Sequence, residues 1–251
     1  MNKPAPKTFF RLVLWEIENC LNLPVLSLIV ASAILAVLVQ STSITGFTHN
    51  YGDLSTGART IFLILTFVTC TLFSHSFAGS FGRGDLKRML SYPVKRWQIF
   101  ISKVFALNLI IFGIYASAYA MNLYINAISL LEPMFYVSLF TIFLQLLFVC
   151  AISVGVSMIA KSELMSIVVS FLLIFGLDNA FNFDAIFTSM GRFSNIFGYF
   201  AQITHPGSLI RVSPVPVTFE QFTGSIVFPL LTAVVVLGIV FVYFTRKMEV
   251  D

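Results

Sequence analysis

The chain alternates between long apolar runs and short polar segments. Six of the apolar runs approach or exceed the roughly 20 residues that a helix, rising about 1.5 Å per residue, needs to cross the hydrocarbon core of a membrane. We therefore expect six spanning helices, at 23–40, 58–81, 99–130, 134–160, 164–180 and 225–244. The third is too long for one membrane thickness, so we expect it to tilt or to project into water.

The segment 8–22 has a different pattern from the runs that follow it. Apolar side chains repeat at helical spacing, at Phe10, Leu14, Ile17 and Leu21. Polar side chains fall on the opposite side, at Arg11, Glu18 and Asn22. This pattern predicts an amphipathic helix in the membrane interface. It is separate from the first span, because Asn22-Leu23-Pro24 marks a break.

The segment 181–224 is too apolar for a free loop and is interrupted too often by Gly and Pro for a span. It predicts short re-entrant helices that enter the outer leaflet while packed against protein. We find no linker and no convincing internal repeat. The expected fold is thus an all-α membrane protein over 1–251: an interfacial helix, six transmembrane helices, and re-entrant helices before the last span.

Composition excludes a soluble protein. Hydrophobic residues make up 58% of the chain and charged residues only 10%, whereas a soluble domain carries about 25% charged residues. If the N-terminus is cytoplasmic, twelve of the 15 Lys and Arg residues face the cytoplasm. That bias is typical of cytoplasmic loops. It accounts for the net charge of +4 without a nucleic-acid partner, and it predicts a multi-pass protein of the cell membrane with both termini inside.

The segment 82–98, between the second and third expected spans, carries a cluster of basic residues. Gly82 and Gly84 break the preceding helix, and Asp85 is suited to cap a new one. The apolar residues of this new helix share one face, at Leu86, Met89 and Leu90. Pro93 ends it, because a proline disfavours the α conformation of the residue before it.

Beyond Pro93 a second helix begins, with Trp97 suited to the headgroup level and Lys103 expected to extend its ammonium group toward water. The basic residues have two interpretations. A positive-inside anchor needs only charge, and it accounts for Lys87 and Arg88 taken singly. A capped, apolar-faced turn followed by a proline favours a docking element that transmits force from a soluble partner to the spans.

These residues resemble the permease subunits of type 2 ATP-binding-cassette (ABC) transporters, the exporter class. The likeness is carried by Asp85-Leu86-Lys87-Arg88-Met89-Leu90-Ser91-Tyr92-Pro93-Val94-Lys95-Arg96, followed by Lys103. This run is similar to the family signature Gly…Leu-Leu-Ser-x-Pro-x-x-Arg…Lys, which forms the coupling helix that docks on a separate ATPase subunit. The order of interfacial helix, six spans and apolar outer segment is also that of the family.

The resemblance implies a set of ATPase-coupling residues, namely Gly84, Asp85, Leu86, Lys87, Arg88, Met89, Leu90, Ser91, Pro93 and Arg96. The inner loop with Lys161 and Glu163 matches a second family contact, and a simple turn accounts for it equally well. One departure concerns a Glu that family members often carry a few residues before the Gly. Here the positions read Gly79-Ser80-Phe81-Gly82-Arg83, so any salt bridge of that Glu has no counterpart.

No P-loop motif and no catalytic constellation occurs in the chain, so we do not expect an enzyme. The resemblance implies that a partner ABC ATPase binds ATP and Mg²⁺, that a second permease chain completes the pathway, and that lipid surrounds both. Ionisable groups at membrane depth make His75 and Asp178 candidates for the substrate path, together with Asn179 beside Asp178. For His75 we favour a hydrogen bond to a neighbouring helix. Two other functions remain open: a carrier driven by an ion gradient, and a non-transporting membrane anchor for a soluble partner.

Overall fold

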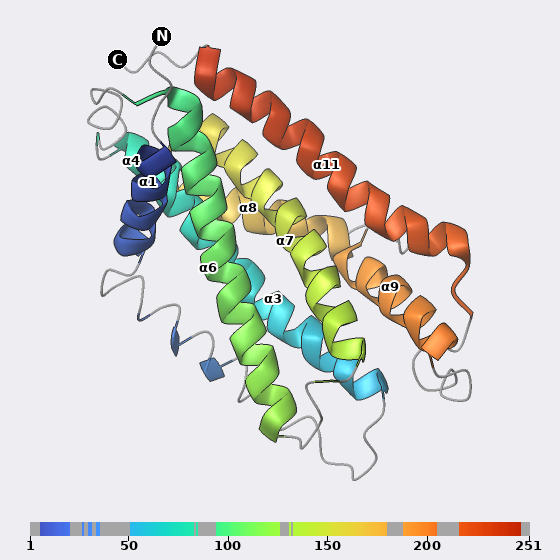
Figure 1. Cartoon of the computed structure of the whole chain (residues 1–251). Helices are drawn as coiled ribbons and strands as arrows, with labels where there is room; N and C mark the ends of the chain where they lie inside the picture. The colour runs from blue at the N-terminus through green and yellow to red at the C-terminus, as the bar shows by residue number, and fades with distance from the viewer. Residues whose placement is uncertain are drawn as a thin grey trace.

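A computed structural model describes residues 6–20, 27, 30–31, 34–35, 51–82, 84, 94–125, 131, 133–179, 188–204 and 216–246. Within these ranges the structure contains helices and turns but no strand. The helices in chain order (Figure 1) are α1 (Pro6–Cys20), α3 (Tyr51–Ser76), α4 (Ala78–Gly82), α6 (Arg96–Ile125), α7 (Pro133–Ala160), α8 (Glu163–Asn179), α9 (Ser189–Thr204) and α11 (Phe219–Arg246).

Helix α7 is the centre of the bundle. It contacts α3, α6, α8, α9 and α11, while α1 packs against α6. Its sequence is apolar around the whole circumference, which is the pattern of a helix surrounded by others, and its residues from Ile142 to Val154 are mostly buried. Helix α1, α4, the start of α6 and the end of α11 lie together at one end of the bundle, here termed the α1 end (Figure 1).

Four helices within the described ranges are long and apolar enough to cross a membrane: Ile61–Phe81, Arg96–Ile125, Pro133–Ala160 and Phe219–Arg246. A fifth apolar helix, Glu163–Gly176, is shorter. Of the expected first span at 23–40, the structure describes only residues 27, 30–31 and 34–35, which are helical. The all-helical membrane fold is therefore confirmed, and the count of six spans stays a prediction.

Two helices begin earlier than the sequence pattern predicts. Helix α3 starts at Tyr51 and not at 58. Helix α11 starts at Phe219 and not at 225, because Thr218 and Gln221 form a reciprocal cap. The Gln221 backbone N–H donates to Thr218 Oγ1 at 3.2 Å, and the Thr218 N–H donates to Gln221 Oε1 at 3.1 Å. This capping box satisfies two backbone donors that a helix start otherwise leaves free.

The second expected span contains one turn residue, Phe77, although the run Ile61–Phe81 as a whole is long and apolar enough to cross a membrane. Helix α3 ends at Ser76, Phe77 forms a turn, and α4 continues the chain from Ala78. The backbone then turns at Gly84, which has a φ of 72° and donates its N–H to the Phe81 carbonyl at 3.2 Å. A positive φ favours glycine because other residues clash there. The predicted break at the glycines is thus present, and a further break precedes it.

Helix α9 lies within the segment for which short re-entrant helices are expected. It packs against α3, α7 and α11 and buries one face, formed by Arg192, Phe193, Ile196, Phe197 and Ala201. A helix packed against protein is therefore present in this segment. Residues 181–187 and 205–215 of the segment lie outside the described residues, and 219–224 form the start of α11.

Candidate functional site

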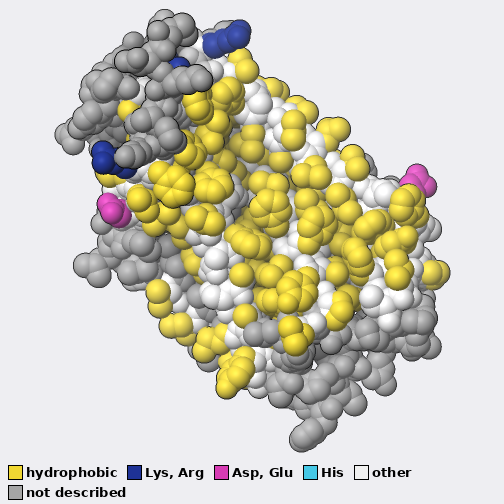
Figure 2. Space-filling model, viewed as in Figure 1, with side chains coloured by type: hydrophobic (Ala, Val, Ile, Leu, Met, Phe, Trp, Pro, Cys, Tyr) yellow, Lys and Arg dark blue, Asp and Glu magenta, His cyan; other side chains and the backbone are white. Residues whose placement is uncertain are grey.

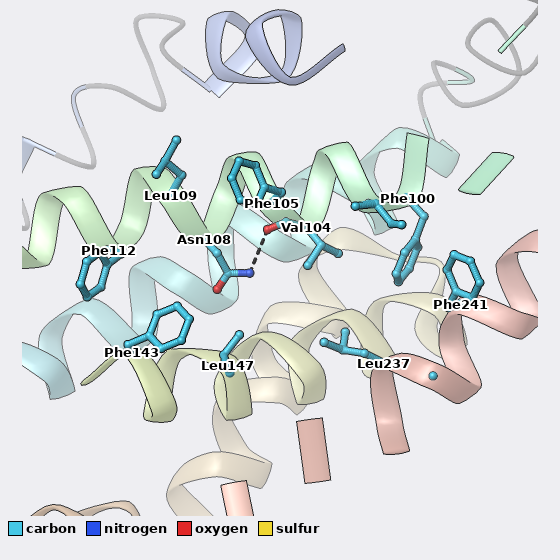
Figure 3. Close-up of a pocket in the computed structure, with 12 residues that line it drawn as sticks. Phe100, Val104, Phe105, Asn108, Leu109, Phe112, Phe143, Leu147, Leu237 and Phe241 are labelled. Atoms are coloured by element: carbon cyan, nitrogen blue, oxygen red, sulfur yellow. Dashed lines mark hydrogen bonds between the residues drawn. The ribbon is translucent and has the colours of Figure 1, made fainter. Parts of the chain in front are cut away.

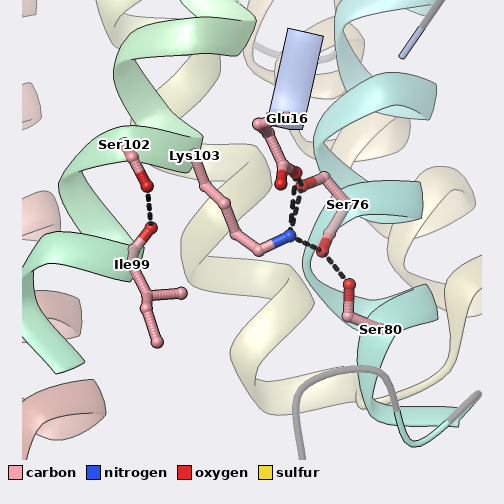
Figure 4. Close-up of polar contacts among 6 residues, drawn as sticks. All are labelled: Glu16, Ser76, Ser80, Ile99, Ser102 and Lys103. Carbon is pink, nitrogen blue, oxygen red and sulfur yellow. Dashed lines mark hydrogen bonds and ion pairs between the residues drawn. The ribbon is translucent and has the colours of Figure 1, made fainter. Parts of the chain in front are cut away.

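A buried polar cluster connects three helices at the α1 end (Figure 4). Glu16 comes from α1, Ser76 is the last residue of α3, and Lys103 lies in the second turn of α6. Their exposed fractions are 4%, 5% and 2%. We name these three residues the Glu16 cluster.

The lysine of the Glu16 cluster has an acceptor for each of its three N–H donors. Lys103 Nζ donates to Glu16 Oε1 at 2.8 Å, to Ser76 Oγ at 3.1 Å and to the Ser76 carbonyl at 3.2 Å. The Ser76 hydroxyl itself donates to Glu16 Oε1 at 2.6 Å. A buried ion pair is tolerated only when its remaining polar groups are satisfied in this way.

The position of the Glu16 cluster relates it to the segment 82–98. Helix α3 and its continuation α4 lead into that segment, and α6 leads out of it. The cluster joins these flanking helices to each other and both of them to α1. The prediction that Lys103 extends toward water is wrong, because its ammonium group has protein partners on two helices. Glu16 also supplies a carboxylate to the Lys of the signature, although the Glu expected ahead of Gly82 is missing.

Most of the predicted coupling residues, from Asp85 to Ser91 and Pro93, lie outside the described residues. Gly84 occupies the turn described above, and Arg96 is exposed at the start of α6. Lys161 is also exposed and has a φ of 51°. Its backbone N–H donates to the Ser157 carbonyl at 3.3 Å and so terminates α7.

Glu163 and His75 form a pair that connects α8 to α3. His75 Nδ1 lies 2.8 Å from Glu163 Oε1, and each side chain is 39% exposed. The hydrogen bond that we favoured for His75 is therefore confirmed. The pair unites one residue predicted for the substrate path with one predicted for ATPase coupling. Because it is partly exposed, it adds little to stability, and its main effect is to orient α8 relative to α3.

Next to this pair, buried serines connect α3, α8 and α7. Ser166 Oγ lies 2.8 Å from Ser74 Oγ and 2.7 Å from Ser157 Oγ. Ser157 Oγ in turn donates to the Ser153 carbonyl at 2.6 Å. All four serines have no exposed surface. Asp178 and Asn179 are the last residues of the same helix α8, and their side chains lie outside the described part of the structure.

A groove of about 620 Å³ lies between α6, α7 and α11 (Figure 3). Its walls are apolar except for Asn108, whose Nδ2 donates to the Val104 carbonyl at 2.8 Å and lies 3.4 Å from Cys150 Sγ. Its three helices are all apolar enough to span a membrane. The groove can therefore hold an apolar molecule, but it offers no charged group to a polar one.

Sequence reasoning did not identify Glu16 or Arg192 as functional candidates. Glu16 lies on the same helical stripe as Val13 and Cys20, and all three are buried. The sequence signal for Glu16 is a carboxylate on the same helical stripe as apolar residues. Arg192 is a basic residue within an apolar segment, and it is completely buried. The lone amide of Gln145 in the apolar run 134–160 is its partner.

Metal-binding groups are absent from the parts of the chain that the structure describes: no three His, Cys, Asp or Glu residues there lie close enough to hold an ion. The three cysteines, Cys20, Cys70 and Cys150, are buried and free.

The apolar helices and the buried polar connections between them define a helical membrane protein in which the two helices that flank a basic loop are tied together. A model of the family described as "ABC-2 family transporter protein" matches residues 11–177, more than half of the chain. The chain belongs to this family, and it is a permease subunit of the ABC-2 type. No curated protein matches the chain significantly.

Members of the ABC-2 membrane family are the permease components of transporters and are generally not enzymes themselves. In general they associate with an ABC ATPase. The matched region contains the complete Glu16 cluster and the His75–Glu163 pair. It ends within α8, so α9 and α11 lie beyond it.

Proposed function

We propose that the chain is the transmembrane subunit of an ATP-driven ABC exporter, which couples to a separate ATPase subunit through the segment 82–98. The observation that carries this proposal is the Glu16 cluster. A loop that served only as an anchor would have no need of buried hydrogen bonds between the helices on its two sides, with a buried ion pair joining one of them to α1.

The Glu16 cluster explains how a push on the loop would reach the spans. The contacts of Ser76 and Lys103 hold the end of α3 and the start of α6 together, so the two helices move as one unit. ATP-driven closure of the ATPase displaces the predicted coupling helix, Asp85 to Ser91, and this unit tilts with it. The tilt alternates access to the pathway, as in other rigid-body transitions.

Orientation follows from the distribution of charge. On the face shown in Figure 2, hydrophobic side chains cover the middle of the bundle, while the Lys and Arg side chains lie toward the α1 end. The positive-inside rule therefore assigns the α1 end to the cytoplasm of the cell membrane and both termini to the inside. Lys161 and Glu163 then lie on the same side as the coupling segment and form a second contact with the ATPase.

The pathway itself forms between two permease chains. His75, Asp178 and Asn179 belong to α3 and α8, and we assign them to the substrate path. The His75–Glu163 pair would transmit movement of the inner loop to that path. In this proposal ATP and Mg²⁺ are bound by the ATPase, and lipid surrounds the permease dimer.

Purification of the tagged chain from its own cell membranes tests the proposal. We expect an ABC ATPase to co-purify and the complex to hydrolyse ATP. Leu86→Asp places a charge on the apolar face of the coupling helix and should reduce the recovered ATPase several-fold. Leu131→Asp, at a residue that is 82% exposed on the opposite side of the bundle, is the matched control. Equal recovery of the ATPase with both variants would contradict docking through this segment.

Transport distinguishes the proposed exporter from the two other functions. Replacing Leu90 or Pro93 should leave membrane insertion intact but uncouple ATP hydrolysis from export. Transport that continues without ATP and follows an ion gradient would indicate a carrier instead. Capture of a partner without any transport would indicate an anchor.

A further inference from the structure

Arg192 is among the largest side chains that the fold buries completely. From α9 it donates through Nε and Nη2 to Gln145 Oε1 of α7, at 3.0 and 2.8 Å. Its guanidinium carbon lies 4.5 Å from the centre of the Phe148 ring and 5.4 Å from that of Phe228 on α11. We name Arg192, Gln145, Phe148 and Phe228 the Arg192 clasp.

The depth of the Arg192 clasp makes it unusual. Gln145 lies near the middle of α7, a helix long enough to cross the membrane. A cation at this depth is costly, and ionisable groups within membranes are retained mainly where they function. Apolar side chains would pack α9 against α7 without that cost, so packing alone does not account for an arginine here.

A second polar contact lies on the same face of α9. Asn195 Nδ2 donates to Ser225 Oγ of α11 at 3.0 Å, and residues three apart on a helix are neighbours. Arg192 and Asn195 therefore hold α9 to two different helices. One hydrogen-bond donor of the Arg192 clasp is unused: Gln145 Nε2 is buried without an acceptor among the described residues.

We propose that Arg192 is a positioning residue whose clasp holds α9 against α7 and α11 and thereby closes the outer end of the pathway. Helix α9 also contacts α3, the helix that leads to the coupling segment. A tilt of α3 would strain the clasp, and its rupture would release α9 and open the path outward. This inference rests on the function and the orientation proposed above.

The test measures how readily α9 separates from the bundle. Ala201 lies near the outer end of α9 and has no exposed surface, so a cysteine in its place reports on undocking. The full chain with Ala201→Cys, in membrane vesicles, is treated from the outside with a membrane-impermeant maleimide. We expect slow labelling in this parent. With Arg192→Met added, we expect labelling about tenfold faster, a change that corresponds to ~1.4 kcal/mol in the docking equilibrium. Arg192→Lys should be intermediate, because lysine lacks the guanidinium fork.

Variants at Gln145 and Asn195 distinguish loss of the Arg192–Gln145 contact from a general loosening of the packing of α9. Gln145→Glu adds a charge that attracts Arg192, so it should slow labelling below the parent, whereas Gln145→Leu should accelerate it. Asn195→Ala removes a neutral hydrogen bond from the same helix and should have a much smaller effect. The clasp is refuted if Arg192→Met labels no faster than Asn195→Ala, or if the two Gln145 variants change the rate in the same direction. Elution of each variant as a single detergent-solubilised species confirms that it is folded.

These measurements need no ATP, so the clasp and the proposed function can fail separately. In the complex with its ATPase, ATP with vanadate should raise labelling of the parent but leave Arg192→Met unchanged. Labelling that depends on Arg192 and Gln145 but not on ATP would retain the clasp and contradict the exporter.

Discussion

At the scale of single residues, the Glu16 cluster shows how a charge is tolerated in an apolar bundle. Lys103 has three acceptors, and Glu16 accepts from both Lys103 and Ser76. The apolar periodicity of 8–22 predicted the helix but not the role of Glu16. Periodicity reports which face of a helix is apolar, whereas this pairing depends on a lysine 87 positions away along the chain.

Replacing only one residue of the buried Glu16–Lys103 pair should destabilise the fold far more than replacing both. Lys103→Met leaves the Glu16 carboxylate buried without its cation, which should lower the free energy of unfolding by about 3–5 kcal/mol. The double variant with Glu16→Leu should recover most of that loss, because an apolar replacement can match a buried ion pair. Thermal unfolding of four proteins in one detergent measures the effect: the parent, Lys103→Met, Glu16→Leu and the double variant. Single-variant losses that simply add in the double variant would contradict the pairing.

The reactivity of the Cys20 thiol provides a second measurement of the effect of Lys103→Met. Burial raises the pKa of its thiol to about 12, the Glu16 carboxylate adds to the rise, and the Lys103 ammonium opposes it. In the intact protein the thiol is therefore protonated at about pH 8 and reacts slowly with iodoacetamide, since only the thiolate is nucleophilic. If Lys103→Met releases α1, the pKa falls toward its ordinary value and alkylation accelerates. If α1 stays docked, loss of the lysine raises the pKa further and alkylation slows.

At the scale of helices, close packing depends on small residues. A Cβ at Gly155 of α7 would lie 3.3 Å from Val236 Cγ1 of α11, so glycine permits the approach of the two helices. At Gly113 of α6, a Cβ would meet nothing within 4 Å. The start of a helix depends on the residues that cap it. The Thr218–Gln221 cap lies before the apolar run, so hydropathy alone placed the start of α11 too late.

These two glycines offer a matched comparison. Gly155→Leu must separate α7 from α11 and should cost about 1–3 kcal/mol of stability, as overpacking in cores does. Gly113→Leu should be tolerated, because its side chain would enter open space. The unfolding temperatures of both variants and the parent, measured in the same lipid nanodiscs, compare their stabilities. Equal destabilisation of the two variants would show that the α7–α11 contact at Gly155 does not set the effect.

At the scale of the whole molecule, composition and hydropathy were sufficient to predict an all-helical membrane protein. The apolar runs expected to span the membrane at 99–130, 134–160 and 164–180 overlap the helices Arg96–Ile125, Pro133–Ala160 and Glu163–Asn179. Composition and hydropathy could not predict which helices touch, because apolar runs contain no information about their neighbours. The polar groups that join α1 to α6, α3 to α8 and α9 to α7 are visible only once the bundle is assembled.

Orientation of the whole molecule can be tested by reporter fusions. A fluorescent protein attached after Asp251 should be bright, because the α1 end and the C-terminus are expected in the cytoplasm. Alkaline phosphatase attached after Leu131, between α6 and α7, should be active, because that turn is expected outside. The reciprocal fusions serve as controls. The opposite pattern would reverse the assignment of the coupling segment to the cytoplasm.

The buried serines that connect α3, α8 and α7 form a chain with a direction. Ser157 commits its only hydroxyl hydrogen to the Ser153 carbonyl, so it must accept from Ser166. Ser166 must then accept from Ser74. The hydrogen bonds therefore run one way, from α3 through α8 to α7, and Ser166 is the relay between the other two helices. Ser166→Ala would therefore remove the acceptor of Ser74 and the donor to Ser157 together.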